Sequence, residues 1–178
     1  MHGKAQADTL RKARSETEIL FPRKANGQLI EGNGKVVGAK IIAQAFSGAA
    51  YFHPRPSAAG TGYQADNSNG TQLGPTNHHL TDRVKADAAA LQSENPNTPV
   101  PIDLVTYSAS GLDPDITPAA AAFQVPRVAK ARGISEDELR SIVAQHTQGR
   151  EFGLLGESRV NVLMLNLDLN SRFPKTKP

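Results

Sequence analysis

The chain has 178 residues, about the length of one domain, and 38% of them are apolar. It contains no cysteine, which excludes disulfides, thiolate metal ligands and a cysteine nucleophile. The formal charge is +3 and the pI is near 9.3, with basic residues gathered toward both ends. Solvated tails explain this mild basicity better than contact with nucleic acid or anionic lipid. No stretch is long and apolar enough for a transmembrane helix, and the N-terminus lacks the apolar core of a signal peptide.

Short strands are expected in the first quarter of the chain. The runs Gln28–Ile30 and Lys35–Val37 flank a turn with two glycines, which predicts a β-hairpin. The apolar run Lys40–Phe46 is too short for periodicity to decide, and we interpret it as a further strand.

A stretch without periodicity follows, from Ser47 to Thr76, rich in Gly, Pro, Asn, Ser and Thr. Loops this long inside a small domain are usually functional or disordered, and the residues leave both readings open. Aromatic and guanidinium groups are enriched at interfaces. The candidate partner-binding residues of this stretch are Tyr51, Phe52, Arg55 and Tyr63.

The centre of the chain gives the clearest local signals. Branched apolar residues in Ile102–Tyr107 predict a strand, and a Gly/Asp/Pro turn follows it. Thr117 followed by Pro118 is typical of an N-cap and a first helical residue. Pro126 removes a backbone donor inside this helix, so we expect a kink or restart near Phe123.

Two more helices and a last strand complete the expected fold. Apolar residues at helical spacing predict an amphipathic helix from Leu80 to Leu91, and Ser135 with Glu138 forms a capping box for another. We interpret Val160–Leu169 as a buried strand rather than a helix. The predicted class is α/β (α+β), with a small mixed sheet, about three packing helices and a long irregular loop.

Two serines and two carboxylates lie in the turn Ser108–Asp115, hereafter the central turn. At first sight this combination favours a hydrolase. Ser108 and Ser110 lie close in sequence to Asp113 and Asp115. The pattern lacks the first glycine of a nucleophile elbow, and no histidine lies at a sequence spacing that would pair it with either serine. Such side chains in a Gly/Pro turn more often bond the backbone, which is the interpretation we favour.

The histidines do not form a metal-binding pattern. His78 and His79 are adjacent and would diverge by about 100° on a helix. His53 and His146 are far from them in sequence. We therefore expect no metal site.

Polar groups lie along one face of the helix after Pro118. Gln124 and Arg127 are three residues apart, where they could hold a phosphate-bearing or carboxylate partner. A solvated face explains the same spacing and is the stronger alternative. The chain has no G-x-x-x-x-G-K-[ST] run, so a Walker-type site is excluded at the motif level.

Five runs, in order, carry a resemblance to a known family. They are F-P-R-K-A-N-G at Phe21–Gly27, Y-F-H-P-R-P-S-A at Tyr51–Ala58, D-L-V-T-Y-S-A-S-G-L-D-P at Asp103–Pro114, Q-V-P-R-V-A-K-A-R at Gln124–Arg132 and V-N-V-L-M-L-N at Val160–Asn166. Residues 19–169 resemble the C subunit of the Kdp potassium-transporting P-type ATPase. The resemblance implies an accessory subunit that has no catalytic centre or cofactor of its own, with ATP and potassium ion acting at the level of the complex.

The resemblance also implies partners and a location. The partners would be a channel-like potassium-binding subunit and an ATP-hydrolysing subunit, whose affinity for ATP the accessory subunit raises as a chaperone. Its domain would lie on the extracytoplasmic side of the cell membrane, over the ion entrance. In this interpretation the Ser47–Thr76 loop contacts the channel-like subunit, and Gln124 and Arg127 are the candidate nucleotide-binding residues. The absent D-K-T-G-T phosphorylation run agrees with a non-catalytic role.

Two features depart from the family pattern. The family places one transmembrane helix directly before the run that matches Ile19–Gly27, where this chain has polar residues. Residues 3–18 instead resemble a segment of the ATP-hydrolysing subunit. We therefore expect a fused or non-native segment at 1–18, the subunit domain at 19–170 and a loose tail at 171–178.

Two other classes of function remain open. One is a small serine hydrolase that uses Ser108 or Ser110. The other is a free-standing binding module for anionic polymers, whose binding would depend steeply on salt.

Overall fold

The computed structural model describes residues 20–32 and 34–174. The chain divides into two compact units, Met1–Ile41 and Ile42–Pro178. The expected fused segment at 1–18 and the last four residues of the expected tail lie outside the described residues. Helices and small antiparallel sheets occur together, which confirms the predicted α/β (α+β) class.

The described part of the first unit is a short helix and a hairpin. Helix α2 spans Pro22–Ala25, and strands β1 (Leu29–Gly32) and β2 (Lys35–Ala39) pair antiparallel with an irregularity after Ile30. The predicted hairpin is therefore confirmed. The strand expected over Lys40–Phe46 is wrong, since β2 ends at Ala39 and the segment after it has no strand partner.

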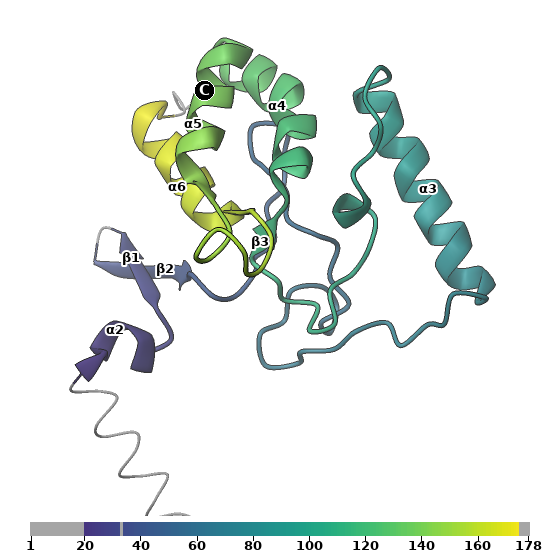
Figure 1. The fold of residues 1–178 in the computed structure, drawn as a ribbon, viewed down its shortest axis with the longest axis horizontal. Helices are drawn as coiled ribbons and strands as arrows, with labels where there is room; N and C mark the ends of the chain where they lie inside the picture. Colours follow the sequence, from purple (N-terminus) through teal and green to yellow (C-terminus); the bar gives the residue numbers. More distant parts are fainter. Residues whose placement is uncertain (1–19, 33, 175–178) are drawn as a thin grey trace, which may run out of the picture. The chain divides into compact units, whose positions relative to one another are not determined.

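The second unit holds three helices side by side, with a small sheet and a separate helix (Figure 1). Its elements in chain order are α3 (His78–Glu94), the 3-10 helix η1 (Ile102–Leu104), β3 (Asp115–Ile116), α4 (Pro118–Arg132), α5 (Glu136–His146), β4 (Thr147–Gln148), β5 (Arg159–Asn161) and α6 (Val162–Arg172). The strand order is β3-β5-β4, and both pairings are antiparallel. Residues 40–77 contain no helix or strand, as expected of the long irregular loop.

Local capping signals determine where α4 and α5 begin. The Thr117 hydroxyl accepts the Ala120 N–H at 3.1 Å, and Ser135 accepts the Glu138 N–H at 3.2 Å. Gly133 ends α4 in the left-handed conformation, with φ of 69°. Helix α4 runs continuously through Pro126, so the expected restart near Phe123 does not occur.

The core of the second unit lies where α4, α5, α6 and β5 meet. Its fully buried side chains come mainly from these elements and include Val125, Val128, Leu139, Val160, Leu165 and Leu169. Phe52 joins them from the long loop and is completely buried. Helix α3 has no buried residue, and Leu91 is its partly buried contact with the core. The core therefore includes a side chain of the long loop as well as those of the helices.

The strand predicted over Ile102–Tyr107 is wrong. The N–H groups of Leu104 and Val105 bond to the carbonyls of Pro101 and Ile102, at 3.1 Å each. These local turns use the backbone groups that a strand ladder would need. Leu104 and Val105 are still buried, but in and directly after a 3-10 turn rather than in a sheet, whereas Ile102 is 74% exposed.

The buried strand predicted over Val160–Leu169 is also wrong, except for its first two residues. Strand β5 ends at Asn161, whose side chain accepts the Met164 N–H at 3.1 Å and caps α6. The apolar residues of Val160–Leu169 recur with neither clear helical nor clear strand periodicity. The sequence therefore indicated that the run is buried, but not that it is a helix. The helix continues through Ser171 and Arg172, the first residues of the expected tail.

Candidate functional site

Two side-chain amides hold the backbone of the long loop against the helices. The Asn166 amide of α6 accepts the Phe52 N–H and donates to the Phe52 carbonyl, at 2.9 Å in both bonds. The Gln124 amide of α4 does the same for His53, accepting its N–H at 2.8 Å and donating to its carbonyl at 3.1 Å. Each side-chain amide supplies the two hydrogen bonds that a neighbouring strand would otherwise supply. The buried backbone groups of this irregular segment are therefore all bonded at Phe52 and His53.

Arg127 strengthens the same attachment one turn along α4. Its Nη1 donates to the carbonyls of Ala49 and Tyr51 at 2.9 and 3.0 Å, and its Nη2 donates to Gln124 Oε1 at 2.7 Å. Its Nε lies 3.1 Å from Glu94 Oε2 on α3. Arg127 therefore ties the loop to both α3 and α4.

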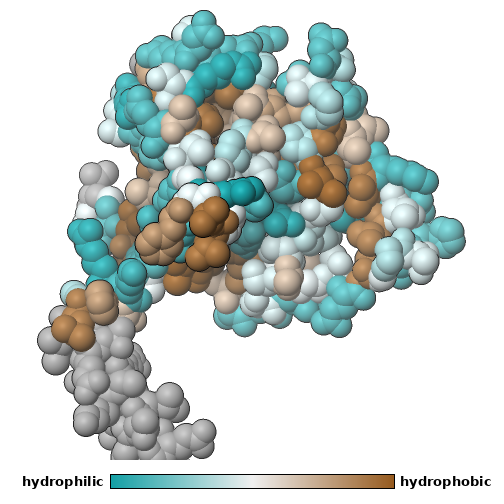
Figure 2. Space-filling view, in the orientation of Figure 1, coloured by the Kyte–Doolittle hydropathy of each residue, from teal (hydrophilic) through white to brown (hydrophobic). Residues whose placement is uncertain are grey.

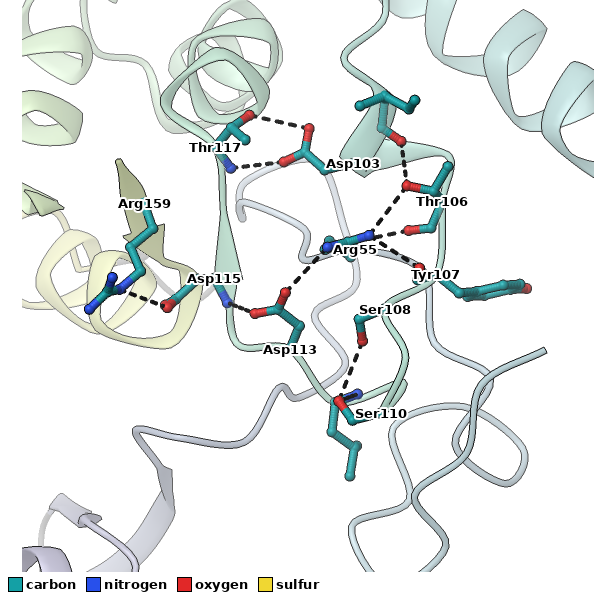
Figure 3. Close-up of polar contacts among 12 residues, drawn as sticks. Arg55, Asp103, Thr106, Tyr107, Ser108, Ser110, Asp113, Asp115, Thr117 and Arg159 are labelled. Carbon is teal, nitrogen blue, oxygen red and sulfur yellow. Dashed lines mark hydrogen bonds and ion pairs between the residues drawn. The ribbon is translucent and has the colours of Figure 1, made fainter. Parts of the chain in front are cut away.

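Arg55 forms a second junction, between the loop and the central turn (Figure 3). Its guanidinium donates to the Thr106 side chain and carbonyl, to the Tyr107 carbonyl at 3.1 Å and to Asp113 Oδ2 at 3.3 Å. The Tyr63 hydroxyl donates to the Arg55 carbonyl at 2.7 Å. The guanidinium bonds join the loop to the turn, and the Tyr63 bond fixes the Arg55 backbone within the loop.

A groove of about 500 Å³ opens between α3, α4, the loop and the turn. It is lined by Phe46, His53, Pro54, Pro56, Tyr63, Arg83, Asp87, Ala90, Leu91, Leu104, Tyr107, Gln124 and Arg127. Apolar side chains line it together with a few charged and hydroxyl groups.

Burial shifts the protonation equilibria of groups on the groove wall. Burial first, and then the positive charge of Arg127, lowers the pKa of His53, while its bond to the Gly48 carbonyl opposes that shift. Burial, together with nearby Tyr107, raises the pKa of Tyr63 to about 12. His53 is therefore held neutral, and Tyr63 keeps its proton at physiological pH.

Arg83 provides the cation on the α3 side of the groove. Its guanidinium carbon lies 4.1 Å from the centre of the Tyr107 ring, and its Nη1 donates to Asp87 Oδ2 at 2.6 Å. Spacing had not suggested Arg83 or Tyr107 as site residues. Their contact joins residues far apart in the sequence, so no local spacing pointed to it.

The candidate nucleotide-binding residues lie together on the groove wall. Gln124 is only 3% exposed, and both its amide oxygen and nitrogen are bonded within the chain. Arg127 is similarly engaged by backbone carbonyls. In this structure both residues position the loop.

The four candidate partner-binding residues have different surroundings. Tyr51, Arg55 and Tyr63 are half-buried, whereas Phe52 is completely buried in the core. Phe52 therefore has no surface to offer a partner, and its expected role is corrected to packing. A large aromatic side chain is strongly stabilised by burial, which sequence composition alone could not assign to this loop.

In the central turn the Ser110 side chain bonds the backbone, as favoured above, whereas the Ser108 side chain contacts Ser110. Ser110 Oγ accepts the Leu112 N–H at 3.1 Å, and Asp113 Oδ1 accepts the Asp115 N–H at 3.1 Å. Ser108 Oγ lies 3.5 Å from Ser110 Oγ. In the part of the chain that the structure describes, no hydrogen bond joins either serine to a histidine.

The histidines are dispersed among unrelated contacts. His146 Nε2 lies 2.8 Å from Asp168 Oδ2, which joins α5 to α6, and His53 contacts Gly48. His78 and His79 lie exposed at the start of α3. Within residues 20–32 and 34–174, no three His, Asp or Glu residues gather as a metal site would require.

Sequence reasoning also missed Asn166, the fully buried amide that holds Phe52. Its signal was a single asparagine in the otherwise apolar run V-L-M-L-N-L at Val162–Leu167. A polar side chain in such a run either costs stability or has a buried partner.

Together these features define a class of protein: an α+β domain whose irregular loop is clamped onto α4 and α6 beside an open groove. The family model of KdpC, described as K+-transporting ATPase, c chain, matches residues 15–171. The chain belongs to this family.

Curated relatives agree with that assignment. The chain is 60% identical over 161 residues to the potassium-transporting ATPase KdpC subunit of Koribacter versatilis, covering 90% of this chain and 83% of the relative. It is 60% identical over 151 residues to the subunit of Acidobacterium capsulatum, covering 85% and 81%. The Methylorubrum extorquens subunit is 56% identical over 162 residues, covering 84% and 81%. All three relatives are named as a subunit of the potassium-transporting ATPase.

Among the residues that the structure describes, none of the helices is both long and apolar enough to cross a membrane.

Proposed function

We propose that the chain is a non-catalytic accessory subunit of an ATP-driven potassium uptake complex. It stabilises the assembly and promotes ATP binding by the ATP-hydrolysing subunit. The observation that carries this proposal is the family match over residues 15–171, with relatives named as KdpC subunits of the potassium-transporting ATPase. Its partners are the channel-like potassium-binding subunit and the ATP-hydrolysing subunit, and its domain lies on the extracytoplasmic side of the cell membrane.

The structure supports a role in binding rather than in chemistry. Three polar side chains position the Ser47–Thr76 loop: Asn166, Gln124 and Arg127 all bind its backbone. Such an arrangement presents Tyr51, Arg55 and Tyr63 on a preorganised surface, which lowers the entropy lost on association. This surface is the proposed contact with the channel-like subunit.

Direct contact of Gln124 and Arg127 with nucleotide remains part of the proposal. Both residues would have to exchange their bonds to the loop for bonds to a phosphate or base. Nucleotide binding would therefore release His53 and Tyr51 from α4, and would loosen the loop. A Gln124→Glu variant keeps the acceptor for the His53 N–H but adds a negative charge that repels phosphate.

The test is reconstitution of the complex from its subunits. Complexes purified with and without this chain are compared for recovery of the other two subunits, for potassium-stimulated ATP hydrolysis and for the KM for ATP. We expect the chain to be captured with both partners and its removal to raise the KM for ATP. Equal assembly and an equal KM without the chain would refute the proposal. A Gln124→Glu complex with an unchanged KM would refute only the nucleotide contact.

A further inference from the structure

An apolar tip projects from the hairpin between α5 and α6. Strands β4 and β5 pair through Thr147 with Val160 and Gln148 with Arg159, and residues 149–158 join them. The apolar tip consists of Phe152, Leu154 and Leu155, which are 92%, 81% and 62% exposed. Apolar side chains gather on this face over the yellow-green loop of Figure 1, as Figure 2 shows.

The turn beneath the tip is well ordered by its own backbone bonds. Glu151 and Leu155 exchange two bonds of 2.9 Å, and the Leu154 N–H donates to the Glu151 carbonyl at 3.1 Å. Phe152 and Gly153 both have positive φ, 54° and 74°, as a type I′ hairpin turn requires. The three apolar side chains are therefore displayed on a preorganised turn.

Phe152 is an unfavourable residue for this position if folding alone is considered. A bulky side chain at positive φ is strained, and Asn would fit the same turn better. Full exposure of a phenylalanine also forgoes the stabilisation that its burial supplies. The cost of exposure disappears in an assembled state if the ring enters an apolar site elsewhere, and that burial would then offset the backbone strain.

The charges at the base of the tip indicate the chemistry of that site. Arg150 pairs with Glu157 at 3.1 Å, and Arg159 lies 3.4 Å from Asp115 and 3.7 Å from Glu151. Two arginines thus face three carboxylates, so the rim has no basic excess. An anionic membrane surface would attract a tip rimmed by unpaired Lys or Arg, and this tip lacks such a rim. An uncharged apolar pocket on a protein matches it better.

We propose that the apolar tip is a docking knob, and that Phe152, Leu154 and Leu155 insert into an apolar pocket on a neighbouring subunit of the potassium-transporting ATPase. This inference rests on the proposed function, because the neighbouring subunit is present only if the chain assembles into that complex. It adds a second contact, separate in sequence from the Ser47–Thr76 loop.

Variants of the full chain separate docking from folding. Phe152→Asn removes the ring and relieves the positive-φ strain, so the Tm is expected to stay equal or rise. Capture by the channel-like and ATP-hydrolysing subunits is expected to weaken about tenfold or more, because a buried aromatic anchor is lost. Leu154→Asn is expected to act in the same direction. Ile102→Asn is the matched control, since Ile102 is 74% exposed but lies on η1 away from the hairpin in sequence.

The measurements are affinity capture with purified subunits, thermal unfolding of each variant and flotation with vesicles of phosphatidylcholine, alone or mixed with phosphatidylglycerol. A variant that assembles as tightly as the wild type, while the wild type is captured normally, overturns the docking knob and leaves the proposed function intact. If the wild type itself is not captured, the proposed function and this inference both fail. Vesicle binding that depends on Phe152 would identify a lipid surface as the occupant and would also overturn the proposal.

Discussion

Gln124 and His53 form a reciprocal pair in which one side-chain amide satisfies both backbone groups of a loop residue. The His53 N–H donates to Gln124 Oε1 at 2.8 Å, and Gln124 Nε2 donates to the His53 carbonyl at 3.1 Å. Asn166 and Phe52 repeat the arrangement on α6. The loop thus obtains the bonds of a sheet without a neighbouring strand.

Replacing Gln124 with Leu removes this pair and the acceptor of Arg127. The buried N–H and carbonyl of His53 then lack partners, so the free energy of unfolding is expected to fall by about 2–4 kcal/mol. Gln124→Glu keeps the acceptor and is expected to lose less. Urea unfolding of both variants measures the difference. Equal stability of Gln124→Leu and the wild type would show that water replaces the amide without loss.

Asn166→Leu tests the second amide in the same way. Asn166 is completely buried, so no solvent can take over its bonds to Phe52. We expect a loss of about 2–4 kcal/mol in the free energy of unfolding. Asn170→Leu, one turn along the same helix, removes only a bond from Arg132 and serves as the control, with an expected loss of about 1 kcal/mol. A larger effect at Asn170 than at Asn166 would contradict the clamp.

Gly111→Ala probes how closely the long loop approaches the central turn. A Cβ on Gly111 would lie 2.5 Å from the Asn69 carbonyl oxygen and 2.8 Å from the Ala59 nitrogen, and the residue has φ of +69°. Both neighbours are backbone, so they cannot rotate away, and we expect a loss above about 2 kcal/mol. Gly133→Ala has the same φ but nothing within 4 Å, so about 1 kcal/mol is expected. Calorimetric Tm values compare the two, and similar losses would contradict the close approach.

The lowered pKa of His53 predicts a stability that falls in mild acid. As the pH drops below the ordinary value of 6.5, the unfolded chain binds a proton at His53 that the folded chain still resists. Stability contributed by the neutral ring is thus present above that pH and is lost below it. The Tm should decrease between about pH 7.5 and about pH 5.5 more steeply for the wild type than for His53→Asn. Parallel slopes would show that His53 protonates freely in the folded state.

The sequence by itself determined the elements whose signals are local. Thr117 and Pro118 marked the start of α4, Ser135 marked the start of α5, and the glycines after Ile30 marked a hairpin. The long aperiodic stretch was correctly expected to lack helices and strands. These predictions succeed because a cap or a turn is stabilised by residues only a few positions apart.

Only the tertiary structure decided which residues of the loop are inside and what holds them there. Phe52 and Asn166 are 114 residues apart, and His53 and Gln124 are 71 apart, so no local window contains either pair. The same limit explains why the burial of Val160–Leu169 was evident while its helical form was not. The sequence does not show which group a side-chain amide will bond. Such a bond becomes more favourable than a bond to water only after the surrounding core has excluded water, and that core exists only in the folded structure.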